Sequence, residues 1–106
     1  MSEWTTGAAI LALAGAAPGS PADVAWSDAC ASAVNAGLDV RLAGVVFDPL
    51  ELPPELVRAA TTAGVEAYKA RETTYVDQQA AANRIAIDYL VTIEPIVGRY
   101  ATTGIA

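Results

Sequence analysis

Alanine is the residue that most constrains what this chain can fold into. It fills 24 of the 106 positions, and it has the highest helix propensity of all amino acids. Each alanine buries little apolar area, so helices rich in alanine pack closely and form thin layers. We therefore expect an all-α fold, a small bundle of about four helices, whose modest stability is raised by contact with neighbouring molecules.

The start of each predicted helix is marked by residues that favour helix N-termini. In Ser20-Pro21-Ala22-Asp23, the serine can accept hydrogen bonds from backbone N–H groups, the proline suits the first helical position, and the aspartate lies at the positive helix end. A threonine, a Pro-Pro pair and a second aspartate mark the other starts. The predicted helices cover about residues 6–15, 21–42, 54–72 and 78–94.

Apolar residues recur in the last three of these helices at the spacing expected of a buried face. The predicted stripes are Trp26, Cys30, Ala33, Val34, Gly37 and Leu38, then Val57, Ala60, Gly64, Val65 and Tyr68, and finally Ile85, Tyr89, Leu90 and Ile93. Residues 48–51 predict a single helical turn, and residues 73–77 predict an extended loop or a very short strand. No internal repeat or long linker divides the chain, so we expect one domain.

The last dozen residues, 95–106, differ from an ordinary chain terminus. A disordered end is normally polar or charged, whereas this segment is mostly apolar and carries one charged side chain, Arg99. Pro95 should kink or end the fourth helix and leave a final turn up to Tyr100. We therefore divide the chain into a single helical domain, residues 1–100, and an extended C-terminal docking tail, residues 101–106, suited to a groove on another protein.

Few residues in the chain are of the types that carry enzyme and metal chemistry. Histidine is absent, which removes the commonest general base and metal ligand. Cys30 cannot form a disulfide or a zinc site by itself, and we expect it to be a small buried apolar residue. Asp48, Glu51 and Glu55 cluster in the sequence, but helix starts explain all three. We predict no enzymatic activity, no cofactor and no metal.

The charge of the chain argues against direct binding of nucleic acid. The net charge is −6, whereas phosphate contacts need clustered Lys and Arg, and the six basic residues are scattered along the sequence. Tyr68, Tyr89 and Tyr100 are expected to pack in a core or an interface, because no basic groove accompanies them for stacking on bases. An acidic surface also suits a channel that DNA must pass without adhering.

An apolar run near the N-terminus, residues 7–17, is similar to the hydrophobic core of a secretory signal. It lacks the positive leader of such signals, since Glu3 is the only charged side chain before it, and it is too short to span a bilayer. We therefore predict a short first helix followed by a turn at Pro18-Gly19, and no membrane partner. Export with removal of this helix stays an alternative.

Several segments together resemble the small head-to-tail connector proteins of long-tailed bacteriophages, which are also called adaptor or head-completion proteins. The segments are residues 33–39 in the second predicted helix, 65–72 in the third, 96–100 near the end, and the closing Gly104-Ile105-Ala106. The likeness covers most of the chain as an order of elements. The segment after Glu72 departs from the family pattern because it lacks a Gly-rich excursion.

This resemblance implies a structural virion protein. Connector subunits form a homo-oligomeric ring, typically a dodecamer, under the portal of the filled capsid. The ring lengthens a channel that DNA passes without specific binding, and it offers a platform to a tail-side stopper or tail-completion protein. The C-terminal segment grips the portal, which makes Arg99, Tyr100, Gly104, Ile105 and Ala106 the portal-docking candidates here. The implied location is the head–tail interface of the virion, after assembly in the host cytoplasm.

A different function class fits the same composition. A small acidic helical protein could act as a regulator or inhibitor that sequesters one partner. A stable one-to-one complex without a ring would distinguish this alternative from the connector.

Overall fold

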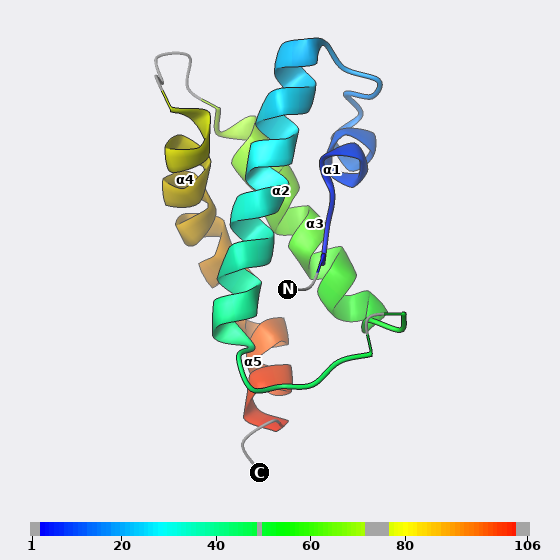
Figure 1. Cartoon of the computed structure of the whole chain (residues 1–106), viewed down its shortest axis with the longest axis vertical. Helices are drawn as coiled ribbons and strands as arrows, with labels where there is room; N and C mark the ends of the chain where they lie inside the picture. Colours follow the sequence, from blue (N-terminus) through cyan, green and yellow to red (C-terminus); the bar gives the residue numbers. More distant parts are fainter. Residues whose placement is uncertain (1–2, 49, 72–76, 104–106) are drawn as a thin grey trace.

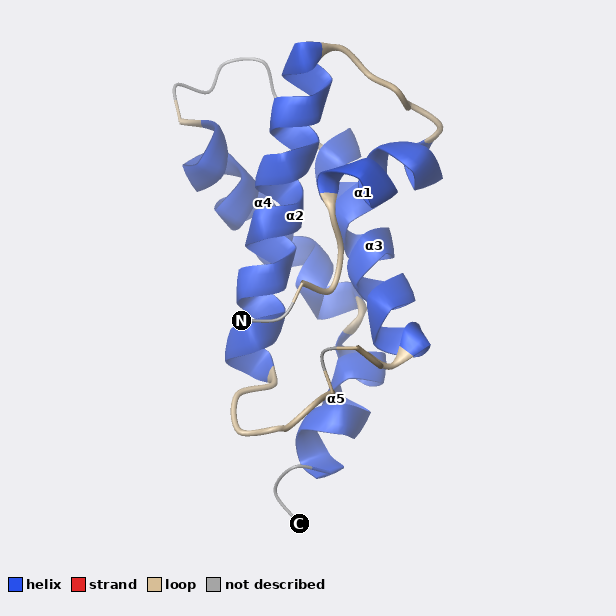
Figure 2. Ribbon diagram, turned by 45° about the vertical axis from the view of Figure 1, so that its right-hand side comes forward, coloured by secondary structure: helices blue, strands red, loops and turns tan. Residues whose placement is uncertain are grey.

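The computed structural model describes residues 3–48, 50–71 and 77–103. All regular secondary structure within these residues is helical. Within these residues there are five helices and no strand (Figures 1 and 2). They are α1 Gly7–Ala14, α2 Pro21–Arg41, α3 Pro54–Lys69, α4 Gln78–Thr92 and α5 Glu94–Thr103. The predicted all-α class is confirmed, and the five helices are roughly consistent with the predicted bundle of about four.

Three of the predicted helix starts are confirmed by side-chain hydrogen bonds at their caps. Ser20 Oγ accepts from the Asp23 backbone N–H at 3.1 Å, and Asp23 Oδ2 accepts from the Ser20 N–H at 3.1 Å. These two hydrogen bonds form a capping box at the N-terminus of α2. Thr6 caps α1, and Asp77 caps α4 through Oδ1, which accepts from the Ala80 N–H at 3.1 Å. Local sequence therefore determines where three of the helices begin.

The longest helix, α2, is the central element, and it packs against α1, α3 and α4. In both ribbon views α1 and α4 lie on opposite sides of α2 (Figures 1 and 2). Trp26, Cys30, Val34 and Leu38 are buried along α2 at four-residue intervals, as the stripe predicts. Because many of the facing residues are alanines, the molecule is slim and measures 44 × 24 × 21 Å.

Two glycines allow neighbouring helices to approach closely. A Cβ at Gly64 of α3 would lie 2.5 Å from Cδ1 and 2.8 Å from Cγ1 of Ile10, a fully buried side chain of α1. A Cβ at Gly37 of α2 would lie 2.4 Å from Cδ1 of Leu90 on α4. Heavy atoms cannot approach this closely, so each contact depends on the missing side chain.

The segment before α1 runs alongside α2, and one side chain of α2 holds it there. Asn35 Oδ1 accepts from the backbone N–H groups of Trp4, at 2.9 Å, and Thr5, at 3.0 Å, while Asn35 Nδ2 donates to the Thr5 carbonyl at 2.9 Å. The Trp4 indole is buried and stands edge-on to Phe47, with 5.1 Å between ring centroids. Together with buried Ile10 and Leu11, this makes α1 part of the core.

Tryptophan is also buried at the other end of α2. The Trp26 indole N–H donates to the Tyr68 carbonyl at 3.0 Å, near the end of α3. The Arg71 guanidinium lies 5.8 Å from the centre of the Trp26 ring, and it pairs with Asp23 at 3.4 Å. These contacts join the start of α2 to the end of α3.

The C-terminal region differs from its prediction. Pro95 does end the preceding helix, since α4 stops at Thr92, but the expected final turn is the ten-residue helix α5. Proline is tolerated in the first turn of a helix, so Pro95 can stand near the start of a new one. Ala101 lies in α5 and is buried. Residues 101–103, which were predicted as part of the tail, therefore belong to α5.

Two predicted connecting segments have different outcomes. Around the expected helical turn at 48–51, the Leu50 N–H donates to Asp48 Oδ1 at 2.9 Å and the Glu51 N–H donates to the Asp48 carbonyl at 3.0 Å, which is a side-chain-capped turn. The expected loop or strand at 73–77 lies almost wholly outside the described residues.

Candidate functional site

Arg99 and Tyr100, two of the predicted docking residues, lie on α5 beside the first turn of α3. The Tyr100 hydroxyl donates to Glu55 Oε2 at 2.9 Å, and the Arg99 guanidinium pairs with Oε1 of the same carboxylate. Phe47 also lies near Tyr100, with 6.4 Å between ring centroids. Glu55 thus holds the last described helix to α3. Gly104, Ile105 and Ala106 lie outside the described residues.

The Glu55 carboxylate also affects the titration of its phenolic partner. The hydrogen bond to Glu55 raises the pKa of Tyr100 above its usual 10.0, and desolvation adds to the shift. Sequence reasoning missed this cluster, because Glu55 was explained by its place at a helix start. Nothing in the local sequence marks a partner more than forty residues away.

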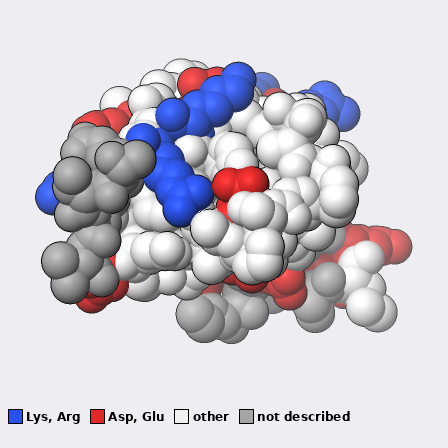
Figure 3. Space-filling model, turned by 90° about the horizontal axis from the view of Figure 1, so that it is seen from above, with Lys and Arg blue, Asp and Glu red and all other residues white. Residues whose placement is uncertain are grey.

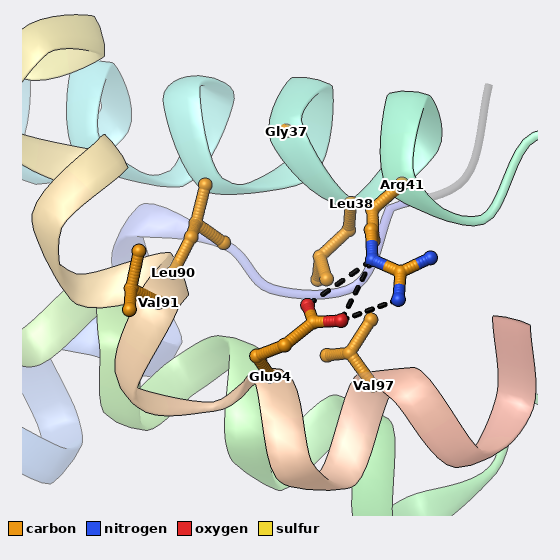
Figure 4. A pocket seen from close by; sticks show the side chains of 7 residues that line it. All are labelled: Gly37, Leu38, Arg41, Leu90, Val91, Glu94 and Val97. Carbon is orange, nitrogen blue, oxygen red and sulfur yellow. Dashed lines mark hydrogen bonds and ion pairs between the residues drawn. The ribbon is translucent and has the colours of Figure 1, made fainter.

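A groove lies between α2, α4 and α5 (Figure 4). We call it the α2–α4 groove, and it is lined by Gly37, Leu38, Arg41, Leu90, Val91, Glu94 and Val97, around a space of about 310 Å³. The two charged residues bind each other: Arg41 Nε donates to Glu94 Oε1 at 2.8 Å and to Oε2 at 3.1 Å. The remaining lining side chains are aliphatic. Val40, one helical turn after Gly37, is 78 % exposed.

The outward side of α1 is a second apolar surface. We call it the α1 face, and it consists of the exposed residues Ala8, Ala12 and Leu13. Leu13 is 57 % exposed, while Ile10 and Leu11 point into the core. No ionisable side chain occurs between Glu3 and Asp23. A solvent-facing helix surface normally carries charged or polar residues, so the composition of the α1 face is that of a contact surface.

The loop between α2 and α3 exposes two further aliphatic side chains. Val46 is 94 % exposed and Leu50 is 92 % exposed. This loop lies at the same end of the molecule as α5 (Figure 1). Isolated surface aliphatics are common in proteins, so the pair carries less weight than the two helix faces.

Basic side chains gather at the opposite end of the molecule, where α2 begins (Figure 3). An acidic group lies beside them in this view, and Arg71 at this end pairs with Asp23. Lys69 lies in the last turn of α3, where a cation is favoured by the helix dipole. Structural roles therefore account for the basic residues named here.

The side chains of types that act in catalysis or metal binding in other proteins are not arranged for such chemistry in the described part of this chain. Cys30 is fully buried, and burial raises the pKa of its thiol to about 12. The described residues contain no group of three Asp, Glu or Cys side chains placed to hold a metal ion. None of the helices in the described ranges is long and apolar enough to cross a membrane.

Comparison with known proteins gives no relative for this chain. No protein-family model, no curated protein and no solved structure matches it. The α1 face, the α2–α4 groove and the Glu55 cluster are thus the features from which a function can be argued.

Proposed function

We propose that this chain is a structural virion subunit of the head-to-tail connector kind. In this role it forms a ring with copies of itself under the portal, extends the DNA channel and offers an attachment platform for tail-side proteins. The observation that carries the proposal is a pair of mainly apolar surfaces on opposite sides of α2, the α1 face and the α2–α4 groove, in which Arg41 and Glu94 pair with each other. A ring of more than two subunits needs two different, complementary surfaces on each subunit.

The sequence resemblance assigns the partners in this proposal. They are further copies of the chain, in a ring of about twelve, the portal protein, and a tail-side stopper or tail-completion protein. DNA passes the ring without specific contacts, in keeping with the net charge of −6 on each copy. The proposed location is the head–tail interface of the virion, after assembly in the host cytoplasm.

The portal-docking end of the molecule is α5 with the residues that follow it. Glu55 fixes the end of α5 through Arg99 and Tyr100, so a segment after Thr103 starts from a defined position. The Arg99 side chain is also mostly exposed, and a guanidinium has donors enough for a second acceptor. Docking would therefore use an anchored helix end and the apolar residues that follow it in the sequence.

Deleting residues 104–106 tests this assignment. We expect the helical content and melting temperature to stay at wild-type values, because α5 ends at Thr103, and we expect capture by immobilised portal protein to be lost. The longer deletion of residues 101–106 is the control, since it also removes buried Ala101 and should lower the melting temperature. Portal capture that survives the shorter deletion would contradict the docking role of the terminus.

The ring itself is tested by negative-stain microscopy of the chain mixed with purified portal. The proposal expects a ring attached to one end of the portal. A chain that remains monomeric and ignores the portal would overturn it.

A second function is favoured by the shape of the α2–α4 groove. A single hydrophobic groove on a small helical protein can accept one amphipathic helix of a partner, which is how a regulator or inhibitor would bind. A stable one-to-one complex with a host protein, without rings, would support this function over the connector.

A further inference from the structure

Two surfaces of this molecule are mainly apolar, although they belong to well-packed helices. The α1 face offers a projecting leucine, Leu13, on a background of alanines. The α2–α4 groove offers a hollow beside Leu90 and Val91. One surface projects and the other recedes, so they are complementary in shape as well as in chemistry.

We propose that the α1 face of one copy docks in the α2–α4 groove of the next copy, with Leu13 inserted beside Leu90 and Val91. This inference rests on the proposed function, because it identifies the surfaces that neighbouring ring subunits would share. It assigns the occupant of the groove as a second copy of this chain.

Charge supports this pairing. The α1 face brings no ionisable side chain into the contact. The two charged groups of the groove, Arg41 and Glu94, already bind each other through two hydrogen bonds of 2.8 and 3.1 Å from Arg41 Nε. Burying an unpaired charge is expensive, and here closing the contact leaves no charge without its counterpart.

The placement of the two surfaces determines the type of assembly. The elements α1 and α4 lie on opposite sides of α2 (Figures 1 and 2). A contact between two different surfaces on opposite sides joins copies head to tail, and each added copy presents a new unfilled groove. Pairing of one α1 face with another would stop at a dimer and leave both grooves uncovered.

Other occupants fit the groove less well. A small molecule is disfavoured because the groove offers aliphatic side chains and one closed ion pair, without the convergent polar groups that orient a ligand.

Two charge-introducing variants test the contact, one in each surface. Leu13→Glu alters the α1 face and Val91→Lys alters the groove. Both side chains are mostly exposed, at 57 % and 68 %, so circular dichroism and melting temperature should match those of the wild type. By sedimentation equilibrium the wild type should self-associate at up to about 1 mM, where even a millimolar contact is half-formed, and each variant should stay monomeric.

A mixture of the two variants gives the sharper result. The Leu13→Glu chain keeps an intact groove and the Val91→Lys chain keeps an intact α1 face, so an equimolar mixture should form a heterodimer and nothing larger. Val46→Glu is the matched control, because it adds a charge at an exposed aliphatic residue of the α2–α3 loop and should associate as the wild type does.

Three outcomes would overturn the inference: a wild type that stays monomeric at the highest concentration, a Val91→Lys chain that still associates, or a mixture without a heterodimer. Portal capture is scored separately. A wild type that captures the portal but fails these tests would contradict the contact and leave the proposed function standing. A wild type that associates as expected but does not capture the portal would support the contact and contradict the proposed function.

Discussion

At the scale of single residues, Asn35 determines how the N-terminal segment is held. Its amide pairs with two backbone N–H groups and one backbone carbonyl, those of Trp4 and Thr5, at 2.9 to 3.0 Å. These backbone groups lie outside any helix, so they depend on side chains or water for hydrogen bonds. One side chain therefore stabilises the path that brings Trp4 into the core.

We expect Asn35→Ala to lower the free energy of unfolding by about 2–4 kcal/mol, since three partly buried backbone groups lose their partner at once. Urea denaturation followed by circular dichroism measures this change. Asn83→Ala is the control, because Asn83 is exposed on α4 and its removal should change the free energy by less than about 0.5 kcal/mol. Equal effects of the two substitutions would refute the role of Asn35.

This role could not be predicted from the sequence. Asn35 stands within a predicted helix whose apolar spacing was correct, and its partners are some thirty residues away in a segment without secondary structure. The stripe Trp26, Cys30, Val34 and Leu38 was predictable because burial on α2 repeats with the helix. A single amide side chain that hydrogen-bonds to one distant segment produces no repeating pattern in the sequence.

At the scale of the elements, helix starts follow the local sequence more closely than the extents of α3 and α5 do. Ser20 and Asp77 begin α2 and α4 as predicted. In contrast, α3 was expected to reach residue 72 and ends at Lys69. The single turn expected after Pro95 is the helix α5, whose buried Val97 and Ala101 give it a packed side. Contacts of this kind are not visible in a run of ten residues.

The two interhelical glycines should respond differently to alanine. Alanine gains about 0.5–1 kcal/mol of helix stability over glycine. At Gly64 the new Cβ meets two carbons of fully buried Ile10, and overpacking costs about 1–3 kcal/mol, so Gly64→Ala should be destabilising. At Gly37 the obstacle is the tip of Leu90, a half-exposed side chain at the edge of the α2–α4 groove. It can rotate aside, so Gly37→Ala should be close to neutral.

Thermal and urea denaturation of both glycine variants measure this difference. The double variant Gly64→Ala with Ile10→Val removes the Cδ1 atom that is nearest to the new Cβ, and it should be less destabilised than the sum of its single substitutions. A Gly64→Ala chain as stable as Gly37→Ala would show that α1 and α3 are not packed as closely as described.

At the scale of the whole molecule, pH should weaken the fold from both sides through two hydrogen-bonded groups. Hydrogen bonds from Ser20 lower the pKa of Asp23 below 3.8, so its contribution is present above that pH and is lost as pH falls through the folded-state pKa. The bond to Glu55 raises the pKa of Tyr100 above 10.0. Its contribution is present below pH 10.0 and is lost as pH rises through the folded-state value.

Melting temperatures from about pH 2 to about pH 11 should show both losses. Asp23→Asn should flatten the acid side, whereas Asp88→Asn, a matched change at an exposed carboxylate on α4, should not. Tyr100→Phe should flatten the alkaline side. An acid limb that is unchanged in Asp23→Asn would place the responsible carboxylate elsewhere.

The candidate surfaces were only partly visible in the sequence. The uncharged run at residues 7–17 could be recognised in the sequence. Which of its residues face solvent could not, because that depends on how α1 packs against α2 and α3. Leu90 and Gly37 were predicted as buried stripe residues, and the hollow that they border arises where three helices meet. Arg99 and Tyr100 were singled out as docking residues, yet their link to Glu55 joins segments far apart in the chain.

The burial of one tryptophan near each end of α2 gives the molecule two built-in fluorescent reporters. Trp4 lies by Asp39, and Trp26 lies on α2 itself, some 20 Å further along the helix axis. With either indole replaced by phenylalanine, the emission of the other follows its own end alone. Coincident unfolding curves from the two would show that both ends melt as one cooperative unit, and separate curves would show which end loosens first.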